Sequence, residues 1–590
     1  MDIFSILTMI GGLALFLYGM EVLGDGLKKA SGGKLEIILE KLTSNKLMAI
    51  LLGAGVTAVI QSSSATTVMV VGFVNSGIMK LSRAVGVILG ANVGTTVTAW
   101  ILSLSDVKGS SLFFQFLKPS SFSPILAIIG ICILHRGKKE IHKNVGTIMV
   151  GFAVLMFGMD TMSNSVTPFA QSPEFSDTLL MFSNPVLGML AGLILTAVIQ
   201  SSSASVGILQ ALCASGAVSY ATAIPIIMGE NVGACMPTLL SGAGGNKGAK
   251  RAALIHLYYN ILKTVTFMAV FYAINAFVHF EFLGQAASAV GVAVIHSAFN
   301  VAAVIIIYPF TSLLERLVYL TIPETEEEKK EGEEGRKEIH LLDARFLSTP
   351  GFALEQCRNV AIDMANHARD ALFLAMELID KFDQKESEKV IELEELVDYY
   401  EDELGSYLVK LSSKHLSEKD SQELSVLLHC IGDFERISDH AINIMESARE
   451  MYEKKLAFSK KAQEELVIFT GAIKDIVNTS VRIFQEEDLK LAGMVEPLEE
   501  VIDYLNSEMK KRHIKRLRKG KCTIEMGFIL SDITTNYERV SDHCSNIALC
   551  LLQLNEENFD THEYQYNLTK KNNVEFIAQV NHLSEQYQLP

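Results

Sequence analysis

Gln61-Ser62-Ser63-Ser64-Ala65-Thr66-Thr67 lies in the middle of an apolar run from Leu47 to Val74. A second copy, Gln200-Ser201-Ser202-Ser203-Ala204-Ser205, follows 139 residues later inside the apolar run from Val186 to Cys213. Polar residues in the middle of a membrane segment cost free energy and tend to be functional. Two copies of one polar cluster in two hydrophobic halves therefore predict the binding site of a transporter.

Charge divides the 590-residue chain into two parts. Of its 51 Lys and Arg and 67 Asp and Glu, residues 1–320 carry 18 and 13, a net charge of +5, and the remainder carries 33 and 54, a net charge of −21. Apolar runs in the first part approach the roughly 20 residues that span a bilayer. We expect a membrane domain followed by an acidic soluble domain, whose charge argues against a nucleic acid partner. The eight Cys show no paired spacing, which indicates free thiols.

A second motif repeats at the same offset. Gly90-Ala91-Asn92-Val93-Gly94 corresponds to Gly229-Glu230-Asn231-Val232-Gly233, again 139 residues later. This period is too long for a solenoid and fits the two halves of a transporter. We expect a transmembrane domain over residues 1–320, with repeats at about 1–135 and 140–280. The apolar segment Phe122–Leu134 has only 13 residues, so whether it spans the membrane stays open.

Basic residues in the loops predict how the halves are oriented. If each Gln-Ser-Ser-Ser run is a hairpin, 14 loop Lys and Arg lie on one side of the membrane and two, Lys108 and Lys118, on the other. If each run crosses, the same residues divide 10 to 6. Cytoplasmic loops are enriched in Lys and Arg, so the hairpin arrangement is favoured. It predicts inverted repeats, hairpin tips that meet near the middle of the membrane, and a cytoplasmic tail.

The serine runs require broken helices to act together. Neighbouring residues on a helix are about 100° apart, so three consecutive hydroxyls converge on one ligand only where the helix breaks. A break exposes N–H groups that attract anions and C=O groups that, with Ser, Thr and Gln oxygens, suit sodium. Asn92 with Thr95 and Thr96, and Asn231, would close this site from the side. The alternative is that the hydroxyls only bond to their own backbone or join helices.

Further polar residues in the apolar segments have two interpretations each. Glu230 stands where the first repeat has Ala91, and is either a cation or proton ligand or a residue at the level of the lipid headgroups. His256 and Asn260, like His296 and Asn300, lie one helical turn apart. For these pairs a hydrogen bond that packs helices together is favoured over a ligand role.

The acidic part predicts a helical bundle. After a charged linker at 321–344, residues 345–552 show helical periodicity, and residues 553–590 form a polar tail. Glu435-Arg436-Ile437-Ser438-Asp439-His440 returns 103 residues later as Glu538-Arg539-Val540-Ser541-Asp542-His543. Each pair of carboxylates lies on one helix face, so two faces that meet would resemble a multinuclear metal site. The alternative is a solvated face of salt bridges.

Motifs typical of enzymes are missing from the sequence. The glycine-rich stretch from Gly242 to Gly248 lacks the Walker-A spacing, and no serine lies in a GxSxG motif. We therefore expect no enzymatic activity.

The doubled Gln-Ser-Ser-Ser motif, each copy followed by the asparagine of Asn-Val-Gly, resembles the type II sodium/phosphate cotransporters over residues 1 to about 320. Residues 345–552 resemble the PhoU family of phosphate-signalling proteins, and this combination is similar to bacterial members of the cotransporter family. The resemblance implies an all-α polytopic membrane protein that moves inorganic phosphate with sodium across the cytoplasmic membrane, with a regulatory tail.

The resemblance also implies ligands. It assigns phosphate to Ser62, Ser63, Ser64, Asn92, Ser201, Ser202, Ser203 and Asn231. It assigns sodium to Gln61, Thr66, Thr67, Thr95, Thr96, Gln200 and Ser205. It assigns divalent or trivalent metal ions to Glu435, Asp439, Glu538 and Asp542. The second copy has Ala234-Cys235 where the first has Thr95-Thr96, so the two halves have different ligands.

Two other functions stay open, a phosphate exporter and a membrane-anchored phosphate sensor. As partners we expect inorganic phosphate, sodium and the lipid bilayer, and through the tail a second copy of the chain or a phosphate-signalling protein.

Overall fold

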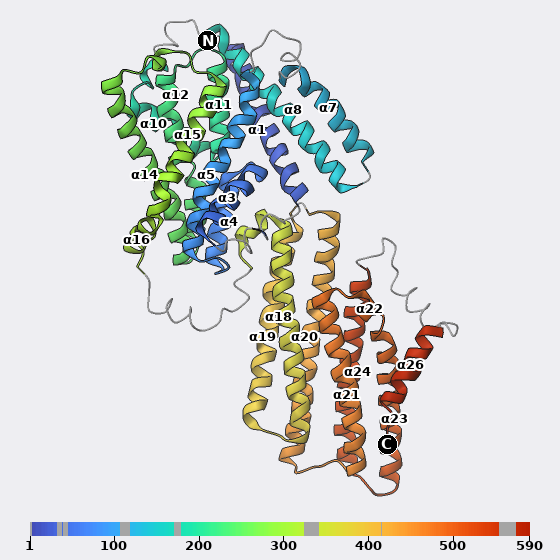
Figure 1. Cartoon of the computed structure of the whole chain (residues 1–590). Coiled ribbons are helices and arrows are strands. Elements are labelled where there is room, and N and C mark those ends of the chain that lie inside the picture. The colour runs from blue at the N-terminus through green and yellow to red at the C-terminus, as the bar shows by residue number, and fades with distance from the viewer. Residues whose placement is uncertain are drawn as a thin grey trace. The chain divides into compact units, whose positions relative to one another are not determined.

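The computed structural model describes residues 3–31, 38, 45–106, 119–137, 139–169, 179–323, 342–414, 416–553 and 574–590. The chain divides into two compact units, Met1–Phe352 and Ala353–Pro590. The described residues form helices and an isolated β-bridge between Ser219 and Ala286, which confirms the predicted all-α class (Figure 1). Most of the predicted linker (324–341), part of the tail (554–573) and the loop residues Lys108 and Lys118 lie outside the described residues.

Apolar helices make up the first unit. They are α1 (Ile3–Ser31), α3 (Lys46–Ile60), α4 (Ser63–Asn75), α5 (Leu81–Ser103), α7 (Pro119–Arg136), α8 (Glu140–Val166), α10 (Pro185–Ile199), α11 (Ser202–Ala214), α12 (Tyr220–Gly233), α13 (Met236–Ala243), α14 (Lys247–Val278), α15 (Ala289–Ile307) and α16 (Thr311–Thr321). Among the described residues, six stretches are long and apolar enough to cross a membrane. The short helix α7 is not one of them, and it packs against α8.

Two helix pairs in this unit are hairpins. A Cβ on Gly90 of α5 would lie 2.0 Å from the carbonyl oxygen of Ile50 in α3, and one on Gly94 would lie 2.5 Å from that of Ala54. The residue numbers of the contacting pairs increase in the same direction along both helices, from Ile50 and Gly90 to Ala54 and Gly94, so α3 and α5 are parallel. The chain must therefore reverse between α3 and α4, which form the first hairpin. The same close approaches between α12 and α10 make α10 and α11 the second hairpin.

The open ends of the two hairpins lie beside opposite ends of α5. The first hairpin ends at Asn75, a few residues before α5 begins at Leu81. In the second hairpin, the Gln210 side-chain amide donates to the Ala99 carbonyl near the other end of α5 (2.9 Å), and to the Ala289 carbonyl at the start of α15 (2.8 Å).

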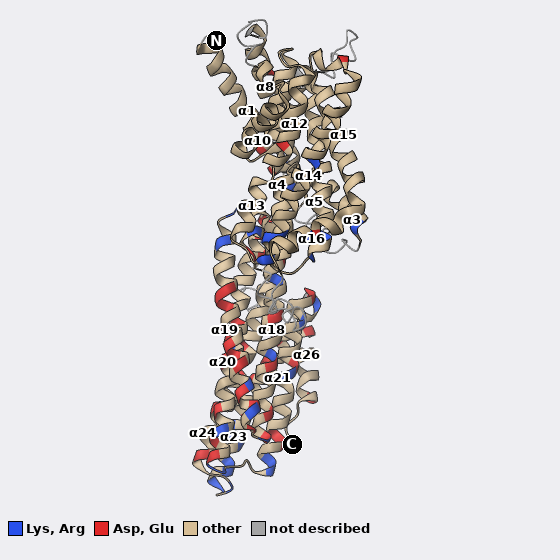
Figure 2. Ribbon diagram, turned by 90° about the vertical axis from the view of Figure 1, so that its left-hand side faces the viewer, with Lys and Arg blue, Asp and Glu red and all other residues tan. Residues whose placement is uncertain are grey.

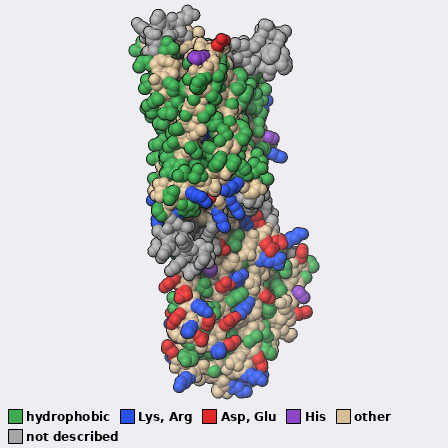
Figure 3. Space-filling view, turned by 60° about the vertical axis from the view of Figure 1, so that its left-hand side comes forward, with side chains coloured by type: hydrophobic (Ala, Val, Ile, Leu, Met, Phe, Trp, Pro, Cys, Tyr) green, Lys and Arg blue, Asp and Glu red, His purple; other side chains and the backbone are tan. Residues whose placement is uncertain are grey.

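Basic residues gather at one end of the first unit. Lys46 at the start of α3 pairs with Glu315 of α16 (3.1 Å), and Asn246 before α14 donates to the Asn75 carbonyl (2.7 Å). Figure 3 shows Lys and Arg at this rim, below a surface that is mostly hydrophobic. Exposed apolar side chains over most of the unit are what contact with lipid requires.

A segment just before the unit boundary packs on this end. It contains the short 3-10 helix η6 (Ala344–Ser348), whose Phe346 is fully buried against Phe73 of α4 and Phe352. Asp343 accepts a hydrogen bond from Asn75, and Arg345 donates to the Ser241 carbonyl of α13. The segment thereby joins the open end of the first hairpin to α13.

The second unit is a bundle of long amphipathic helices. They are α18 (Pro350–Asp380), α19 (Gln384–Ser412), α20 (Glu418–Glu453), α21 (Lys460–Glu486), α22 (Leu489–Ala492), α23 (Val495–Arg518), α24 (Ile524–Gln553) and α26 (Val574–Gln586). Their Ala, Leu, Ile and Val faces are buried, and Figure 2 shows charged residues distributed along the length of these helices. The predicted helical bundle is therefore confirmed.

Candidate functional site

The two glutamines of the repeated motif end a helix in the same way. Gln61 follows α3 with φ 60°, and Gln200 follows α10 with φ 59°, both in the left-handed region. Each backbone N–H bonds back to a threonine carbonyl, that of Thr57 or Thr196. The next residue is extended in both copies, so each helix pair breaks at the predicted point. The broken helix therefore follows from the local chain conformation of the motif.

The serines after each break start the second helix of the hairpin. Ser62 caps α4 by accepting a hydrogen bond from the Ala65 N–H (3.2 Å), and Ser201 caps α11 in the same way. The Oγ atoms of Ser63 and Ser202 lie 3.5 Å apart, and both side chains are buried. The tips of the two hairpins therefore meet, and hydroxyls of both repeats converge at one place.

The predicted sodium ligands of the first hairpin, Gln61, Thr66 and Thr67, each bond to a threonine of another helix. Thr66 Oγ1 accepts from Thr57 Oγ1 (3.1 Å), while Thr67 Oγ1 lies 2.8 Å from Thr238 Oγ1 in α13. The Gln61 amide oxygen accepts from Thr98 (2.9 Å). The first hairpin therefore has a buried set of hydroxyl and amide oxygens.

The second hairpin is built differently. Ser205 donates to the Ser201 carbonyl, just as Thr66 donates to that of Ser62. The buried Thr196 hydroxyl, however, has no partner among the described residues, whereas its counterpart Thr57 donates to Thr66. Gln200 is exposed, whereas Gln61 is buried. The predicted difference in ligands between the halves is thus accompanied by a difference in their surroundings.

Thr95 and Thr96 do not reach across to the hairpin tips by any described hydrogen bond. Each bonds to its own helix, Thr95 to the Ala91 carbonyl (3.0 Å) and Thr96 to the Val93 carbonyl (2.7 Å). For these two residues the structure has the local backbone bonding that was the alternative to a ligand role.

Asn92 and Asn231 meet at a lysine that the sequence analysis overlooked. Lys263 of α14 is fully buried, and its Nζ donates to Asn92 Oδ1 (3.2 Å), Asn231 Oδ1 (3.0 Å) and Asn300 Oδ1 (2.8 Å). The ring centroid of Tyr259 lies 4.9 Å from Nζ. A lone Lys inside the apolar segment Ala252–Phe277 was the signal available in the sequence, because charges in membrane segments are costly and functional.

The remaining polar residues of these helices have mixed roles. The Asn260 and Asn300 amides bond the carbonyls of His256 and His296 one turn earlier, so each pair has a local bond, and Asn300 also joins the lysine cluster. Glu230 is buried, and neither carboxylate oxygen has a hydrogen-bond partner among the described residues. Burial inside the protein does not fix the depth of Glu230 in the membrane, so its role as a proton or cation ligand stays a prediction.

In the second unit each predicted carboxylate face lies against a neighbouring helix with carboxylates of its own. Burial first, and then the charges of Asp439, Asp398 and Glu401, raise the pKa of Glu435 to about 7. Ligand atoms of Glu394, Asp398 and Asp439 lie within 4.8 Å of one another. The first face of α20 therefore lies toward α19, a partner that the sequence analysis did not predict.

The second face repeats this arrangement on other helices. Burial and the nearby charges of Glu538 and Asp542 raise the pKa of Asp503 in α23. Burial also raises the pKa of Glu499 to about 8, together with the charge of Asp503. The expectation that the faces of α20 and α24 would meet each other was wrong, because each lies toward the helix before it in the chain.

Two histidines join α20 and α24 as a crossed pair, in which each histidine bonds a residue of the other helix. His440 Nδ1 lies 2.8 Å from Asn536 Oδ1, and His543 Nδ1 donates to Asp433 Oδ1 at 2.9 Å. The two imidazole rings are 5.6 Å apart. Burial lowers the pKa of His440. The repeated Asp-His motif therefore joins the two halves of the bundle through its histidines.

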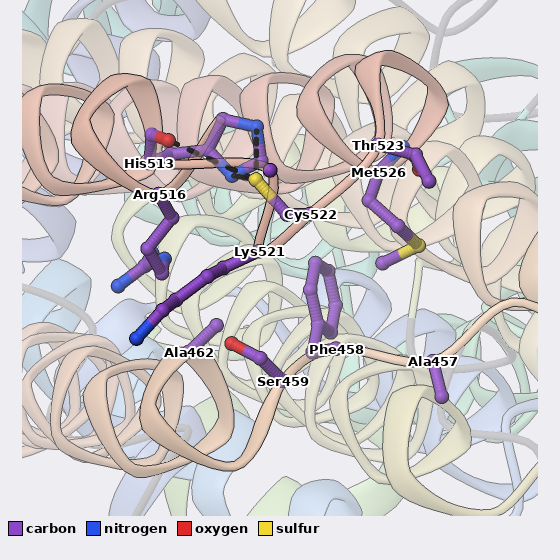
Figure 4. Close-up of a pocket in the computed structure, with 11 residues that line it drawn as sticks. Ala457, Phe458, Ser459, Ala462, His513, Arg516, Lys521, Cys522, Thr523 and Met526 are labelled. Carbon is purple, nitrogen blue, oxygen red and sulfur yellow. Dashed lines mark hydrogen bonds between the residues drawn. The ribbon is translucent and has the colours of Figure 1, made fainter. Parts of the chain in front are cut away.

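A cavity of about 380 Å³ in the second unit lies apart from both carboxylate faces (Figure 4). It is lined by the start of α21 at Ser459 and by His513, Arg516 and Lys521 of α23 and the turn after it. Cys522 Sγ lies 3.7 Å from His513 Nε2. None of the residues predicted from the sequence as ligands lines this cavity.

Comparison with known proteins agrees with both units. Residues 15–164 and 169–303 match the family described as Na+/Pi-cotransporter, and residues 361–448 and 469–551 match the PhoU domain. The chain is similar to the Escherichia coli protein named "Putative inorganic phosphate export protein YjbB", with 24% identity over 570 residues, 95% of this chain and 100% of that protein.

Two further relatives match the first unit. "Uncharacterized protein YqeW" of Bacillus subtilis is 30% identical over 312 residues, which cover 53% of this chain and 96% of that protein. "Sodium-dependent phosphate transport protein 2A" of Rattus norvegicus is 35% identical over 152 residues, 25% of this chain and 24% of that protein. With its apolar spans and doubled hairpins, the chain is a multi-pass membrane protein that belongs to the Na+/Pi-cotransporter family and carries a PhoU domain.

Proposed function

We propose that this protein moves inorganic phosphate across the cytoplasmic membrane together with sodium, and that the site is where the two hairpin tips meet. The observation that carries the proposal is the 3.5 Å contact between Ser63 and Ser202, the same position of each repeat. Residues of both repeats meet a second time at Lys263, which holds Asn92 and Asn231. The name of the rat relative supports both sodium and phosphate.

The tip chemistry suits an oxyanion. Both α4 and α11 begin at the tip, so two helix N-termini, which favour negative charge, lie at the place where the serine hydroxyls converge. Ser62, Ser63, Ser64 and their counterparts Ser201, Ser202 and Ser203 would donate to phosphate oxygens. Lys263 would supply positive charge nearby.

Sodium would take the oxygen-rich side of the first hairpin. The buried oxygens of Gln61, Thr66 and Thr67 are hard, neutral ligands of the kind that sodium takes at helix breaks. Thr95 and Thr96 are weaker candidates because, among the described hydrogen bonds, their hydroxyls bond only within their own helix, whereas those of Thr66 and Thr67 also bond threonines of other helices. In the second half, Gln200 and Ser205 remain candidates, and the unpartnered Thr196 hydroxyl adds one.

We propose that the halves are inverted repeats that expose this site alternately to the two sides. Support comes from the hairpins, whose open ends lie beside opposite ends of α5. The basic rim at the starts of α3 and α14 would be cytoplasmic, since cytoplasmic loops are enriched in Lys and Arg. The tail would then also be cytoplasmic.

The PhoU domain would regulate transport and bind metal ions. Glu394 and Asp398 with Glu435 and Asp439 would hold one group of cations, and Glu499 and Asp503 with Glu538 and Asp542 a second. The carboxylate oxygens of Glu394, Asp398 and Asp439 are close enough to share one ion. Hard carboxylate ligands suit divalent or trivalent cations.

Phosphate export is a second candidate, because the relative matched over 95% of this chain has export in its name. Import and export use the same site and differ in the gradients that drive them. A sensor without transport is the third alternative.

Three forms of the protein separate these functions. The triple Ala variant of Ser62, Ser63 and Ser64 should lose phosphate flux with unchanged expression. A chain that ends at residue 352, and so keeps the whole first unit, should retain flux if that unit is the transporter. The sensor is favoured instead if the full chain shows no flux and the truncated chain loses a cellular response to phosphate. A comparison of phosphate release from phosphate-loaded cells with phosphate uptake by phosphate-depleted cells decides the physiological direction of transport.

A further inference from the structure

We propose that the ammonium group of Lys263 is a tethered cation that takes the place of one coupling sodium ion at the junction of the two halves. The inference rests on the proposed function and adds a residue that sets the number of sodium ions moved with each phosphate. Nothing in the repeated motifs points to this residue, because Lys263 has no counterpart at the 139-residue offset.

The surroundings of Lys263 Nζ are those of a cation site. Three amide oxygens from three helices, those of Asn92 in α5, Asn231 in α12 and Asn300 in α15, lie 2.8 to 3.2 Å away. Three acceptors match the three N–H donors of an ammonium group. A cluster of neutral oxygens is also what a monovalent cation coordinates at broken helices in transporters.

These oxygens are fixed in direction by the other end of each amide. The Nδ2 atoms of the three asparagines donate to the carbonyls of Ile88, Ile227 and His296, each one turn earlier in the same helix, at 2.8 to 2.9 Å. The amide groups therefore cannot flip without losing a buried hydrogen bond, which costs free energy. The three oxygens would stay pointed at the same spot if the lysine were shortened.

The charge of Lys263 has no acidic partner among its described contacts. It contacts the three amide oxygens and the ring faces of Tyr259 and Phe299, with centroids 4.9 and 5.1 Å away. The titratable side chains close enough to interact with its charge, Cys235, His256 and His296, include no carboxylate. A buried charge with neutral neighbours is costly unless a counter-charge arrives. A phosphate bound between the hairpin tips would supply that charge. Before phosphate binds, the charge of Lys263 would thus attract the anion, and no sodium ion would be needed at this position.

The lysine also joins both halves, because it binds one asparagine from each at the same repeat position. A free cation at this junction would bind the anion and then leave with it. A tethered one stays, so one fewer sodium ion crosses with each phosphate.

The test is the coupling ratio of Lys263→Met, measured with purified full-length protein in proteoliposomes at a membrane potential clamped to zero. The ratio follows from the opposing phosphate gradient that stops net flux at a fixed sodium gradient. Loss of the tethered cation should add one sodium ion. With a tenfold sodium gradient, the balancing phosphate ratio should then rise about tenfold. Lys250→Ala, on the exposed face of the same helix, is the matched control.

A second readout does not need transport. The protein has a single Trp, Trp100 in α5, so its fluorescence follows unfolding of the first unit. Sodium should raise the unfolding temperature of Lys263→Met and Lys263→Gln more than that of wild type, with potassium as the reference salt.

The outcomes separate the two proposals. If wild type moves no phosphate but sodium stabilises the Lys263 variants more than wild type, the proposed function fails and the tethered cation stands. If wild type transports, while the variants keep the wild-type ratio or lose flux without any gain in sodium stabilisation, Lys263 only packs helices and the inference is overturned.

Discussion

Ser63 in α4 and Ser202 in α11 lie 139 residues apart in the sequence, and their Oγ atoms are 3.5 Å apart in space. They occupy the same position in two copies of one motif, so the proposed site needs both repeats. Both are buried, and both follow a serine that caps its helix. A site assembled from two equivalent tips would be reached from either side as the halves move.

Removing either hydroxyl should therefore impair transport. Ser63→Ala and Ser202→Ala should each lower the kcat/KM for phosphate about 10- to 100-fold, the loss expected for one hydrogen bond to a charged ligand. Ser76→Ala and Ser215→Ala are matched controls, because these serines bond to their own helices at the far ends of the hairpins. Equal uptake by the tip and control variants would contradict the site.

Much of this site could be predicted from the sequence, because the repeat offset pairs residues that the fold brings together. The breaks at Gln61 and Gln200 and the meeting of the tips followed from the two serine runs. Lys263 could not be paired in this way, since it occurs once. Its partners lie on helices far away in the chain, and only the folded structure shows that three asparagine oxygens point to it.

In the second unit the sequence predicted which carboxylates share a helix face, but not which helix lies opposite each face. Helical spacing placed Glu435 with Asp439, and Glu538 with Asp542, on common faces. It did not specify what lies opposite, and the two faces were wrongly expected to meet each other. Glu394 and Asp398 belong to the stretch Leu393-Glu394-Glu395-Leu396-Val397-Asp398-Tyr399, which returns 105 residues later as Leu498-Glu499-Glu500-Val501-Ile502-Asp503-Tyr504, and the sequence analysis missed this repeat. The packing of α19 and α23 places these carboxylates opposite the two faces.

The segment at the unit boundary should hold the first hairpin in place. Phe346→Ala removes a fully buried ring that contacts Phe73 and Phe352, which costs about 3–5 kcal/mol for a large buried aromatic residue. The unfolding temperature followed by Trp100 fluorescence should fall. Phe277→Ala, at a residue that is 87% exposed, should change it little. A Phe346 variant as stable as wild type would show that the segment only rests on the surface.

The carboxylate faces predict how the stability of the second unit depends on pH. The pKa of Glu435 is about 7 and that of Glu499 about 8 in the folded protein, against ordinary values of 4.5, chiefly because burial disfavours the charged form. Between pH 4.5 and about 8 the folded state therefore binds more protons than the unfolded state. Without added metal, the contribution of these carboxylates to stability should be greatest near pH 4.5 and should fall as the pH rises to about 8. His440, whose pKa is lowered, contributes in the opposite direction below about pH 6.5.

This dependence is testable with matched variants. Glu435→Gln should raise stability at pH 8 and leave it unchanged at pH 4.5, whereas Glu446→Gln, on the exposed part of α20, should do neither. Far-UV circular dichroism follows both units and Trp100 fluorescence only the first, so their difference reports the second unit. Manganese should stabilise wild type at pH 8 more than at pH 5. Stability that rises steadily from pH 4.5 to 8 in the presence of a chelator would contradict the assignment.

The crossed histidines should hold α20 against α24. Asp433→Ala leaves His543 and Asn546 without their acceptor, which should cost about 1–3 kcal/mol. Asp433→Asn should cost less, because Asn536 fills the equivalent position for His440 in the other half. Circular dichroism during chemical unfolding measures both variants. If the Asn variant is as unstable as the Ala variant, the charge of Asp433 matters more than its hydrogen bonds.

The most direct test of the central claim is uptake of labelled phosphate into proteoliposomes that contain the purified full-length chain. An inward sodium gradient is compared with an equal potassium gradient, with the triple Ala variant of Ser62, Ser63 and Ser64 as the control for leak. The account predicts uptake with sodium, none with potassium, and none by the variant. Uptake that is equal with both ions, or absent with both from a folded protein, would contradict sodium-coupled phosphate transport.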